Sequence, residues 1–321
     1  MKSQYIENLV EKDKPIDSLF AIKEKQNVHP YKDNSKFMFT LKISDKTGEM
    51  NLNYFGGENQ SDVESVYSTI EVQDVVKIIG ITNEWNGINI IVNPDSGSIT
   101  KTVDYDLSDF LPMTKKDIPQ MVSELKDIIS KIENVDIKQL LESVFNNETF
   151  MEKYSKSPAA SSNHHSFGGG LIEHVLSMIK ISMKVVEMHP ELDKDLLIAG
   201  CVFHDIGKVN ELKASVSIEY TTEGNLLGHI SIGQKMVNDW IDKLESFPDI
   251  LKQKIIHMIL SHHGEKKWGS PIEPLFPEAT ALHYIDNLDS SIQHVLQEKE
   301  KAGKDDKWIR DYKGYPKMYL E

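Results

Sequence analysis

The hydrophobic periodicity of this chain changes between residues 104 and 114, from a period of two residues to one of three or four. Residues 36–43 alternate between apolar and polar side chains, as a strand with one buried face does. Further apolar runs of strand length follow at 50–55, 74–81 and 88–92. Several short strands joined by close turns predict a small all-β barrel for the first part of the chain. Residues 61–70 are expected to form a helix or loop that interrupts it.

The second part of the chain has a helical pattern. Apolar residues recur every three or four positions over 118–132, as on one face of an amphipathic helix. A second helix is expected over 137–154. Further helices are expected at 171–188, 194–205, 228–245, 249–262 and 277–297. An all-α domain is therefore predicted to follow the barrel.

Seven side chains that can bind metal ions lie between residues 174 and 286. They are His174, His204, Asp205, His229, His262, His263 and Asp286. Imidazole and carboxylate together suit divalent Mn, Fe, Co or Zn. Asp205 directly follows a histidine and could bridge two ions. Two ions about 3.5–4 Å apart form a clamp for the hydrolysis of phosphate esters, so the pattern indicates a metal-dependent phosphodiesterase.

The turn that contains Asp205 is expected to present its polar side chains at one helix end. Gly207 is predicted to end the helix in a left-handed conformation. Lys208 would then lie near the ions, where it can bind a phosphate as a point charge. A single histidine on an apolar helix is more often structural than a ligand, and we interpret His257 and His283 in this way. Asp289 is expected to support a ligand rather than bind metal.

Composition limits the partners of this chain. The 50 acidic residues outnumber the 36 basic ones, which gives a net charge of −14. This charge argues against broad binding of duplex nucleic acid. The longest apolar runs are too short to cross a membrane, and the only cysteine, Cys201, fits a reducing cytoplasm. A globular cytoplasmic protein without membrane contact is expected.

The order and spacing of the seven ligands resemble the HD-domain metal-dependent phosphohydrolases. Further motifs resemble the YhaM family of bacterial 3′-to-5′ exoribonucleases. These motifs lie at residues 164–171, 219–221, 224–231, 257–264, 269–271 and 283–289. The family pattern has an arginine where this chain has Gly168, which weakens an expected phosphate contact.

The resemblance implies an N-terminal OB-fold domain at 1–103, a linker with leading helices at 104–155, and an HD domain at 156–300. Residues 301–321 form a C-terminal tail, whose aromatic residues offer a surface for self-association into a homo-oligomer. Two ions are implied, with Asp205 as the shared ligand. The first set of ligands is His174, His204, Asp205 and Asp286. The second set is Asp205, His229, His262 and His263.

The implied activity is metal-dependent 3′-to-5′ hydrolysis of single-stranded RNA to nucleoside 5′-monophosphates, with single-stranded DNA as a further expected substrate. Asp205 and Lys208 would be the catalytic residues, and Mn would be the first choice of metal. Two alternatives stay open at this point. One is a phosphohydrolase of free or cyclic nucleotides, and the other is an inactive RNA-binding scaffold.

Candidate contacts to a nucleic acid come from the outward side of the barrel, because OB-folds bind single strands across that face. If Phe39 and Leu41 face inward, Lys42 and Phe55 face outward. Trp85 would sit at a turn, where it could stack on a base. His165 could line the substrate channel of the helical domain.

Overall fold

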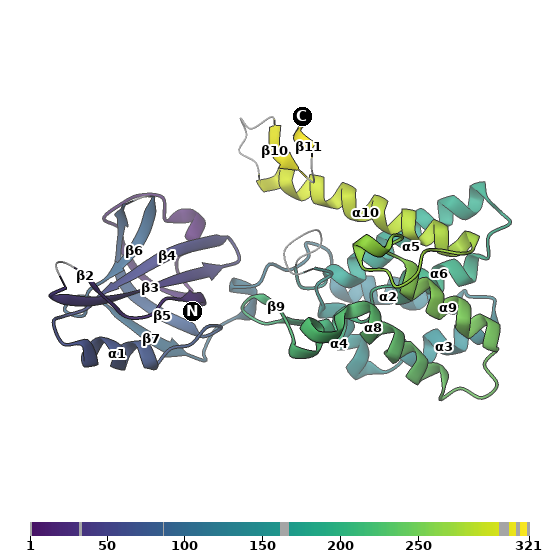
Figure 1. Ribbon diagram of the computed structural model, residues 1–321, viewed down its shortest axis with the longest axis horizontal. Helices are drawn as coiled ribbons and strands as arrows, with labels where there is room; N and C mark the ends of the chain where they lie inside the picture. Colours follow the sequence, from purple (N-terminus) through teal and green to yellow (C-terminus); the bar gives the residue numbers. More distant parts are fainter. Residues whose placement is uncertain are drawn as a thin grey trace. The chain divides into compact units, whose positions relative to one another are not determined.

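The computed structural model describes residues 2–31, 34–85, 87–160, 167–301, 308–312 and 315–319. The chain forms two compact units, shown in Figure 1. The first comprises Met1–Pro112 together with Ala214–Ser217, and the second comprises Met113–Lys213 with Ile218–Glu321. Within the described residues, no helix combines the length and the apolar character needed to span a membrane.

The first unit is a closed barrel. Its five strands are β1 (Pro15–Lys25), β3 (Lys36–Asp45), β4 (Gly48–Phe55), β5 (Val75–Glu84) and β6 (Ile88–Val92). They pair in the order β1-β3-β4-β6-β5, and β5 pairs with β1 to close the barrel. The β4–β6 pairing is parallel and the other pairings are antiparallel. Helix α1 (Gln60–Ser68) connects β4 to β5. This topology is that of an OB-fold and confirms the predicted fold class.

The predicted inward face of the barrel is also confirmed. Phe39 and Leu41 are fully buried, and Leu52 and Tyr54 on the neighbouring strand are buried beside them. Two shorter strands, β2 (His29–Tyr31) and β7 (Ser98–Thr102), extend the sheet beyond the closed barrel.

A buried ion pair ties the N-terminal segment to the barrel. Nζ of Lys2 lies 2.9 Å from Oδ2 of Asp45, and neither side chain is exposed to solvent. Nζ also lies 4.0 Å from the centre of the Phe20 ring. Asp45 accepts further hydrogen bonds from the backbone N–H groups of Ile6 at 2.9 Å and Thr47 at 2.8 Å. The charge of Asp45 is therefore fully surrounded by donors.

The second unit is helical. Its longer helices are α2 (Ile118–Ser130), α3 (Val135–Phe145), α4 (Glu148–Lys156), α5 (Gly170–Met188), α6 (Lys194–Phe203), α8 (Thr222–Ile241), α9 (Asp249–Ser261) and α10 (Pro277–Lys301). The single helix predicted over 137–154 is wrong. The chain breaks at Asn146 and Asn147, because the Asn147 side chain accepts a hydrogen bond from the backbone of Phe150 and begins α4 as its N-cap.

Two β-hairpins accompany these helices. The first consists of β8 (Leu212–Ala214) and β9 (Ile218–Tyr220), and the second of β10 (Trp308–Tyr312) and β11 (Tyr315–Tyr319). Neither was predicted from the sequence. Residues 214–217, at the tip of the first hairpin, belong to the barrel unit, where Val216 is buried in an apolar cluster.

Candidate metal centre

The seven predicted ligands come from five separate segments of the helical unit. His174 lies on α5, and His204 and Asp205 follow directly after α6. His229 lies on α8 just after Gly228, whose positive φ of 70° interrupts the helix. His262 and His263 follow α9, and Asp286 lies on α10. Helix ends and helix faces that are distant in sequence thus meet at one place.

The two oxygens of Asp205 face different histidines. Oδ2 lies 3.2 Å from Nε2 of His204 and 4.0 Å from Nε2 of His174. Oδ1 lies 3.4 Å from Nε2 of His229 and 3.7 Å from Nε2 of His262. One carboxylate therefore touches two sets of nitrogen atoms, which is the arrangement that a ligand shared by two ions requires.

Two compact groups of ligand atoms lie on either side of Asp205. They are His174, His204 and Asp286, and His229, His262 and His263. Within each group the atoms lie within 4.8 Å of one another. Oδ1 of Asp286 lies 3.3 Å from Nε2 of His174. The same two groupings follow from the sequence resemblance.

Backbone carbonyl groups orient three of the histidines. Nδ1 of His204 donates to the carbonyl of Cys201 at 2.9 Å, and Nδ1 of His262 donates to that of Ile259 at 2.8 Å. Nδ1 of His263 donates to the carbonyl of Trp268 at 2.9 Å. With the proton on Nδ1, each Nε2 keeps its lone pair for a ligand in the centre.

Carboxylates orient the other two histidines. Asp289 accepts from Nδ1 of His174 at 2.7 Å and also from the hydroxyl of Ser177. Glu211 accepts from both the backbone N–H and Nδ1 of His229, at 2.8 and 3.1 Å. The supporting position expected for Asp289 agrees with this contact. Glu211 was missed from the sequence, because nothing in its spacing shows that the turn after Asp205 folds back onto α8.

Several polar atoms of this centre are buried without the partners that such atoms need. Nε2 of His204, His229 and His262 and Oδ1 of Asp205 have no hydrogen-bond partner among the described residues. Buried acceptors left in this state are costly, and a bound cation would satisfy them together. Imidazole nitrogens and carboxylate oxygens form a donor set that fits divalent first-row metals. The residues present therefore fit the divalent metal that the sequence predicts.

The electrostatics of the centre keep Asp205 and His262 in states suited to cations, whereas His174 holds a proton that a bound ion would have to displace. Burial raises the pKa of Asp205, but the charges of Lys208 and the histidines outweigh burial and hold the pKa well below its usual range. Burial and the neighbouring His263 hold the pKa of His262 well below its usual value. Burial lowers the pKa of His174, yet the carboxylates of Asp286 and Asp289 raise it to about 9.

Lys208 lies inside the centre, with Nζ 2.5 Å from Oδ2 of Asp205. Burial lowers its pKa, but the carboxylates of Asp205 and Asp286 outweigh burial and raise the pKa above its ordinary value. The side chain remains 13% exposed. Lys208 therefore carries a positive charge beside Asp205, and a small part of its side chain is exposed to solvent.

The prediction for Gly207 is wrong. Its φ of −62° and ψ of −21° are right-handed, and a short helix α7 (Lys208–Glu211) follows immediately. A Cβ atom at this position would lie 2.0 Å from the carbonyl oxygen of His229 and 2.6 Å from the backbone nitrogen of Gly233. Close approach between the turn and α8, rather than left-handed geometry, is what requires a glycine here.

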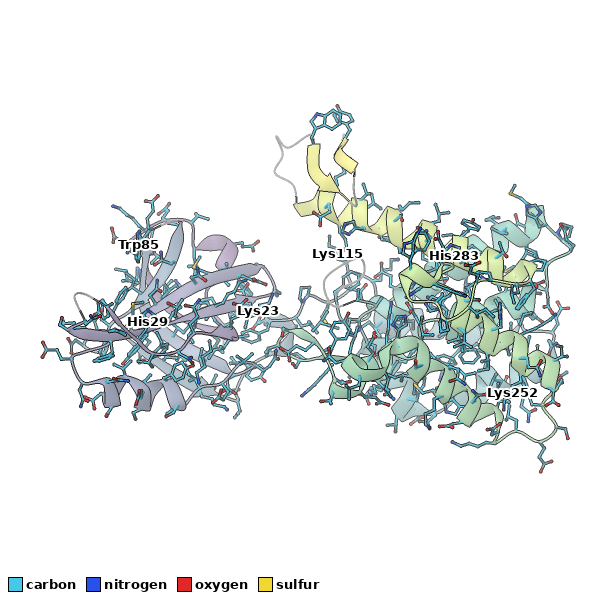
Figure 2. All side chains as sticks on the ribbon, viewed as in Figure 1. Lys23, His29, Trp85, Lys115, Lys252 and His283 are labelled. Carbon is cyan, nitrogen blue, oxygen red and sulfur yellow. The ribbon has the colours of Figure 1, made fainter. Side chains whose placement is uncertain are left out.

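The other histidines considered have structural contacts. Nε2 of His257 accepts from the backbone N–H of Leu275 at 3.1 Å. His283, labelled in Figure 2, donates from Nδ1 to the carbonyl of His262 at 2.8 Å and packs against Gly264. Both agree with the structural role expected from the sequence.

The four candidate contacts to nucleic acid differ in accessibility. Lys42 forms ion pairs with Glu24 and Glu49 at 3.3 and 3.0 Å. Phe55 is half-buried, and Trp85 is 66% exposed at the turn after β5 (Figure 2). His165 lies outside the described residues. The barrel thus leaves Trp85 as its most accessible aromatic candidate.

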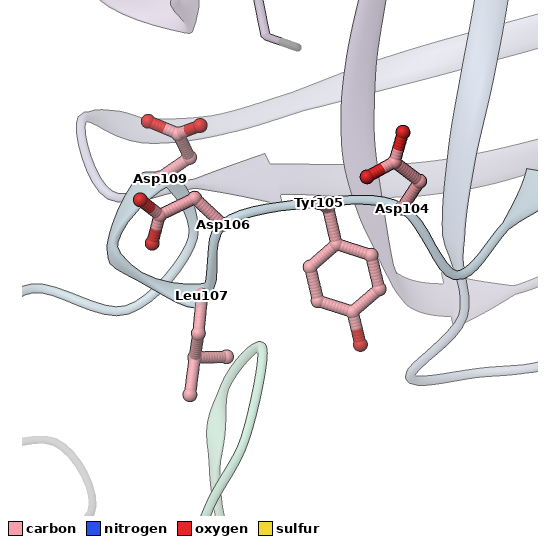
Figure 3. Close-up of a pocket in the computed structure, with 5 residues that line it drawn as sticks. All are labelled: Asp104, Tyr105, Asp106, Leu107 and Asp109. Atoms are coloured by element: carbon pink, nitrogen blue, oxygen red, sulfur yellow. The ribbon is translucent and has the colours of Figure 1, made fainter.

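A hollow of about 460 Å³ in the barrel unit is shown in Figure 3. It is lined by Asp104, Tyr105, Asp106, Leu107 and Asp109. Asp109 already accepts a hydrogen bond from the hydroxyl of Tyr5 and lies 3.8 Å from Nζ of Lys46. Three carboxylates would repel a phosphate backbone, so this hollow is unsuited to nucleic acid.

Comparison with known proteins agrees with this geometry. The HD domain family model matches residues 171–291, the segment that contains all seven predicted ligands. The chain is 35% identical to the 3′-5′ exoribonuclease YhaM of Bacillus licheniformis, over 84% of this chain and 83% of the relative. It is 33% identical to YhaM of Bacillus subtilis over 84% of this chain and 83% of that protein. It is 36% identical to YhaM of a Geobacillus strain, with 84% and 81% covered. Such similarity over most of both proteins shows that this chain belongs to the YhaM family of 3′-5′ exoribonucleases.

Proposed function

We propose that this protein is a metal-dependent exoribonuclease that removes nucleotides from the 3′ end of single-stranded RNA. One observation carries the proposal. The two oxygens of Asp205 each face a separate group of buried imidazole nitrogens, at 3.2–4.0 Å. This arrangement supports a carboxylate shared by two ions, which a two-ion phosphodiesterase centre needs. Mn is the proposed metal, because the mixed nitrogen and oxygen donors suit it, with Fe, Co and Zn as alternatives.

The ligands proposed for the first ion are His174, His204, Asp205 and Asp286, and those for the second are Asp205, His229, His262 and His263. Ions bound there would activate a water molecule and neutralise phosphate oxygens in the transition state. The net reaction is hydrolysis: water adds to phosphorus, and the bond to the 3′ oxygen of the preceding nucleotide breaks. The released product is a nucleoside 5′-monophosphate.

The chain's own residues prepare this step. Glu211 and Asp289 hold His229 and His174 with their Nε2 atoms directed inward. The ammonium of Lys208 forms an ion pair with the carboxylate of Asp205, with 2.5 Å between Nζ and Oδ2. A cation at Oδ2 would weaken this contact and leave the ammonium available to a phosphate oxygen. Lys208 would then bind the scissile or the adjacent phosphate as a point charge.

In this proposal the first part of the chain binds the RNA and the second part cleaves it. Residues 1–103 capture the single strand, with Trp85, Phe55 and Lys42 as contacts, and residues 156–300 cleave its end. Residues 104–155 connect them. Aromatic stacking is tolerant of sequence and of sugar type, so single-stranded DNA is proposed as a second substrate.

The test uses single-stranded RNA labelled at its 5′ end and protein stripped of metal, with and without added Mn²⁺. A ladder that shortens from the 3′ end only with metal, and that is absent for Asp205→Ala, is the expected result. Asp239→Ala is the matched control, since Asp239 is an exposed α8 residue whose contact is Lys235. Release of phosphate or monophosphate from free nucleotides, with RNA left intact, would instead support a small-molecule phosphohydrolase.

A further inference from the structure

The loop after His262 and His263, which follow α9, presents an exposed tryptophan beside the proposed metal centre. Trp268 ends a short 3-10 helix (Lys266–Trp268), and 48% of its surface is exposed. Its carbonyl oxygen accepts the hydrogen bond from Nδ1 of His263 at 2.9 Å. The residue that holds one proposed ligand in place therefore also carries a large apolar ring at the surface.

This loop is held firmly. Gly264 and Gly269 have φ values of 81° and 99°, which a larger residue would rarely adopt. The backbone N–H of Trp268 donates to the carbonyl of Glu265 at 2.9 Å. A Cβ atom at Gly264 would lie 2.4 Å from the His283 ring, so the loop is packed closely on that side chain.

His283 also supports the indole. The rings of Trp268 and His283 are stacked, with centroids 6.2 Å apart and an angle of 28° between their planes. His283 itself donates to the carbonyl of His262 at 2.8 Å. The indole therefore stacks on the buried His283 ring, which is hydrogen-bonded to His262. The backbone of Trp268 is hydrogen-bonded to the next proposed ligand, His263.

We propose that Trp268 forms the stacking platform for the 3′-terminal base of the RNA. This proposal rests on the proposed exoribonuclease activity. A scissile phosphate bound at the metal ligands is separated from the terminal base by one sugar, which brings that base within reach of the adjacent indole. Every base offers a flat π-face, so the contact would hold the end of the strand without reading its sequence.

The surroundings of the ring suit this ligand. Nζ of Lys267 lies 4.8 Å from the centre of the indole and 2.7 Å from Oε2 of Glu265, in an exposed ion pair whose lysine side chain is 65% exposed. A base can displace this flexible side chain, and its charge would then lie near the sugar–phosphate backbone. Because the ring is already fixed by its supports, little conformational entropy is lost when a base stacks on it.

The experiment compares two single-stranded RNAs that differ only at the 3′-terminal nucleotide, which carries a base in one and is abasic in the other. The rate of removal of that nucleotide in the presence of Mn²⁺ is measured as kcat/KM. For the wild type, we expect loss of the base to lower kcat/KM by about tenfold to a hundredfold. Trp268→Ala should lower kcat/KM on the intact RNA by a similar factor, and loss of the base should then have no further effect.

Two further variants make the result specific. Trp268→Phe keeps an aromatic face and should retain most of the dependence on the terminal base. Trp85→Ala removes the exposed tryptophan of the barrel, and its dependence on the terminal base should equal that of the wild type. Equal metal content and melting temperature of Trp268→Ala and wild type would exclude a disturbed fold.

The outcomes separate the two proposals. If loss of the base costs Trp268→Ala as much as it costs the wild type, the stacking platform is refuted while the exoribonuclease activity stands. If the wild type releases no nucleotide from the intact RNA, the proposed activity fails, and the platform fails with it.

Discussion

Glu211 binds His229 twice, accepting a hydrogen bond from its backbone N–H at 2.8 Å and another from Nδ1 at 3.1 Å. The pair fixes both the position of α8 and the direction of the imidazole ring. Glu211 is 6% exposed, so water cannot readily replace it. The glutamate therefore acts on one proposed ligand of the second ion without touching the centre itself.

We expect Glu211→Ala to weaken binding of one of the two ions by about 10- to 100-fold. The backbone N–H of His229 would lose its acceptor, and the ring would be free to rotate. Metal content after dialysis against a range of Mn²⁺ concentrations measures the effect. Glu223→Ala changes an exposed acid on the same helix and should bind metal as the wild type does. Unchanged binding of both ions by Glu211→Ala would contradict the role given to Glu211.

Asp289 has the corresponding role on the other side of Asp205. Its Oδ2 accepts from Nδ1 of His174 at 2.7 Å, and it is 3% exposed. Asp289→Ala should weaken binding of the ion held by His174 by about 10- to 100-fold. Binding of the ion held by His229 should be unchanged. The same titration with Glu211→Ala and with the double variant checks this independence, since the double variant should bind both ions about 10- to 100-fold more weakly. Loss of both ions from either single variant would argue against two separate groups of ligands.

Gly207 gives a test of backbone packing. An added methyl group would meet the carbonyl oxygen of His229 at 2.0 Å. A shift of either backbone to relieve this contact would move Asp205 or His229, which are proposed ligands. Gly207→Ala should lower the free energy of unfolding by about 3 kcal/mol and reduce metal binding. Thermal unfolding and metal content measure these two effects. Gly57→Ala is the control, because no atom of the described residues other than Gly57 and its two chain neighbours lies within 4 Å of the added Cβ. A stable, metal-binding Gly207→Ala protein would show that this packing is looser than the distances indicate.

The sequence predicted elements whose pattern is local. The alternation over 36–43 gave the buried face of β3 because side-chain direction in a strand has a period of two. The grouping of the histidines came from resemblance to a family, and the structure brings the same residues together. Each ligand lies on a helix or at its end, and such positions are visible in a helical pattern.

What the sequence did not show depends on contacts between distant residues. The hydrogen bonds from His229 to Glu211 form only because α7 folds back onto α8. The same close approach explains why position 207 requires a glycine. The break between α3 and α4 depends on the Asn147 side chain, which caps a helix rather than continuing one. The hairpin β8–β9 consists of strands of three residues each, too short for a periodic pattern to be recognised.

The buried pair of Lys2 and Asp45 allows a comparison with an exposed pair in the same barrel. Lys2→Met removes the ammonium and leaves a carboxylate with no solvent exposure beside the apolar core. Breaking a buried pair in this way should cost about 3 kcal/mol. Lys23→Met breaks the pair of Lys23 with Glu49, whose side chains are 41% and 36% exposed, and should cost less than about 1 kcal/mol. Native-state hydrogen exchange of the β3 segment reports the opening of the barrel separately from the helical unit. Equal protection in the two variants would show that the donors from the backbone of Ile6 and Thr47 suffice to hold Asp45, and that the ammonium adds little.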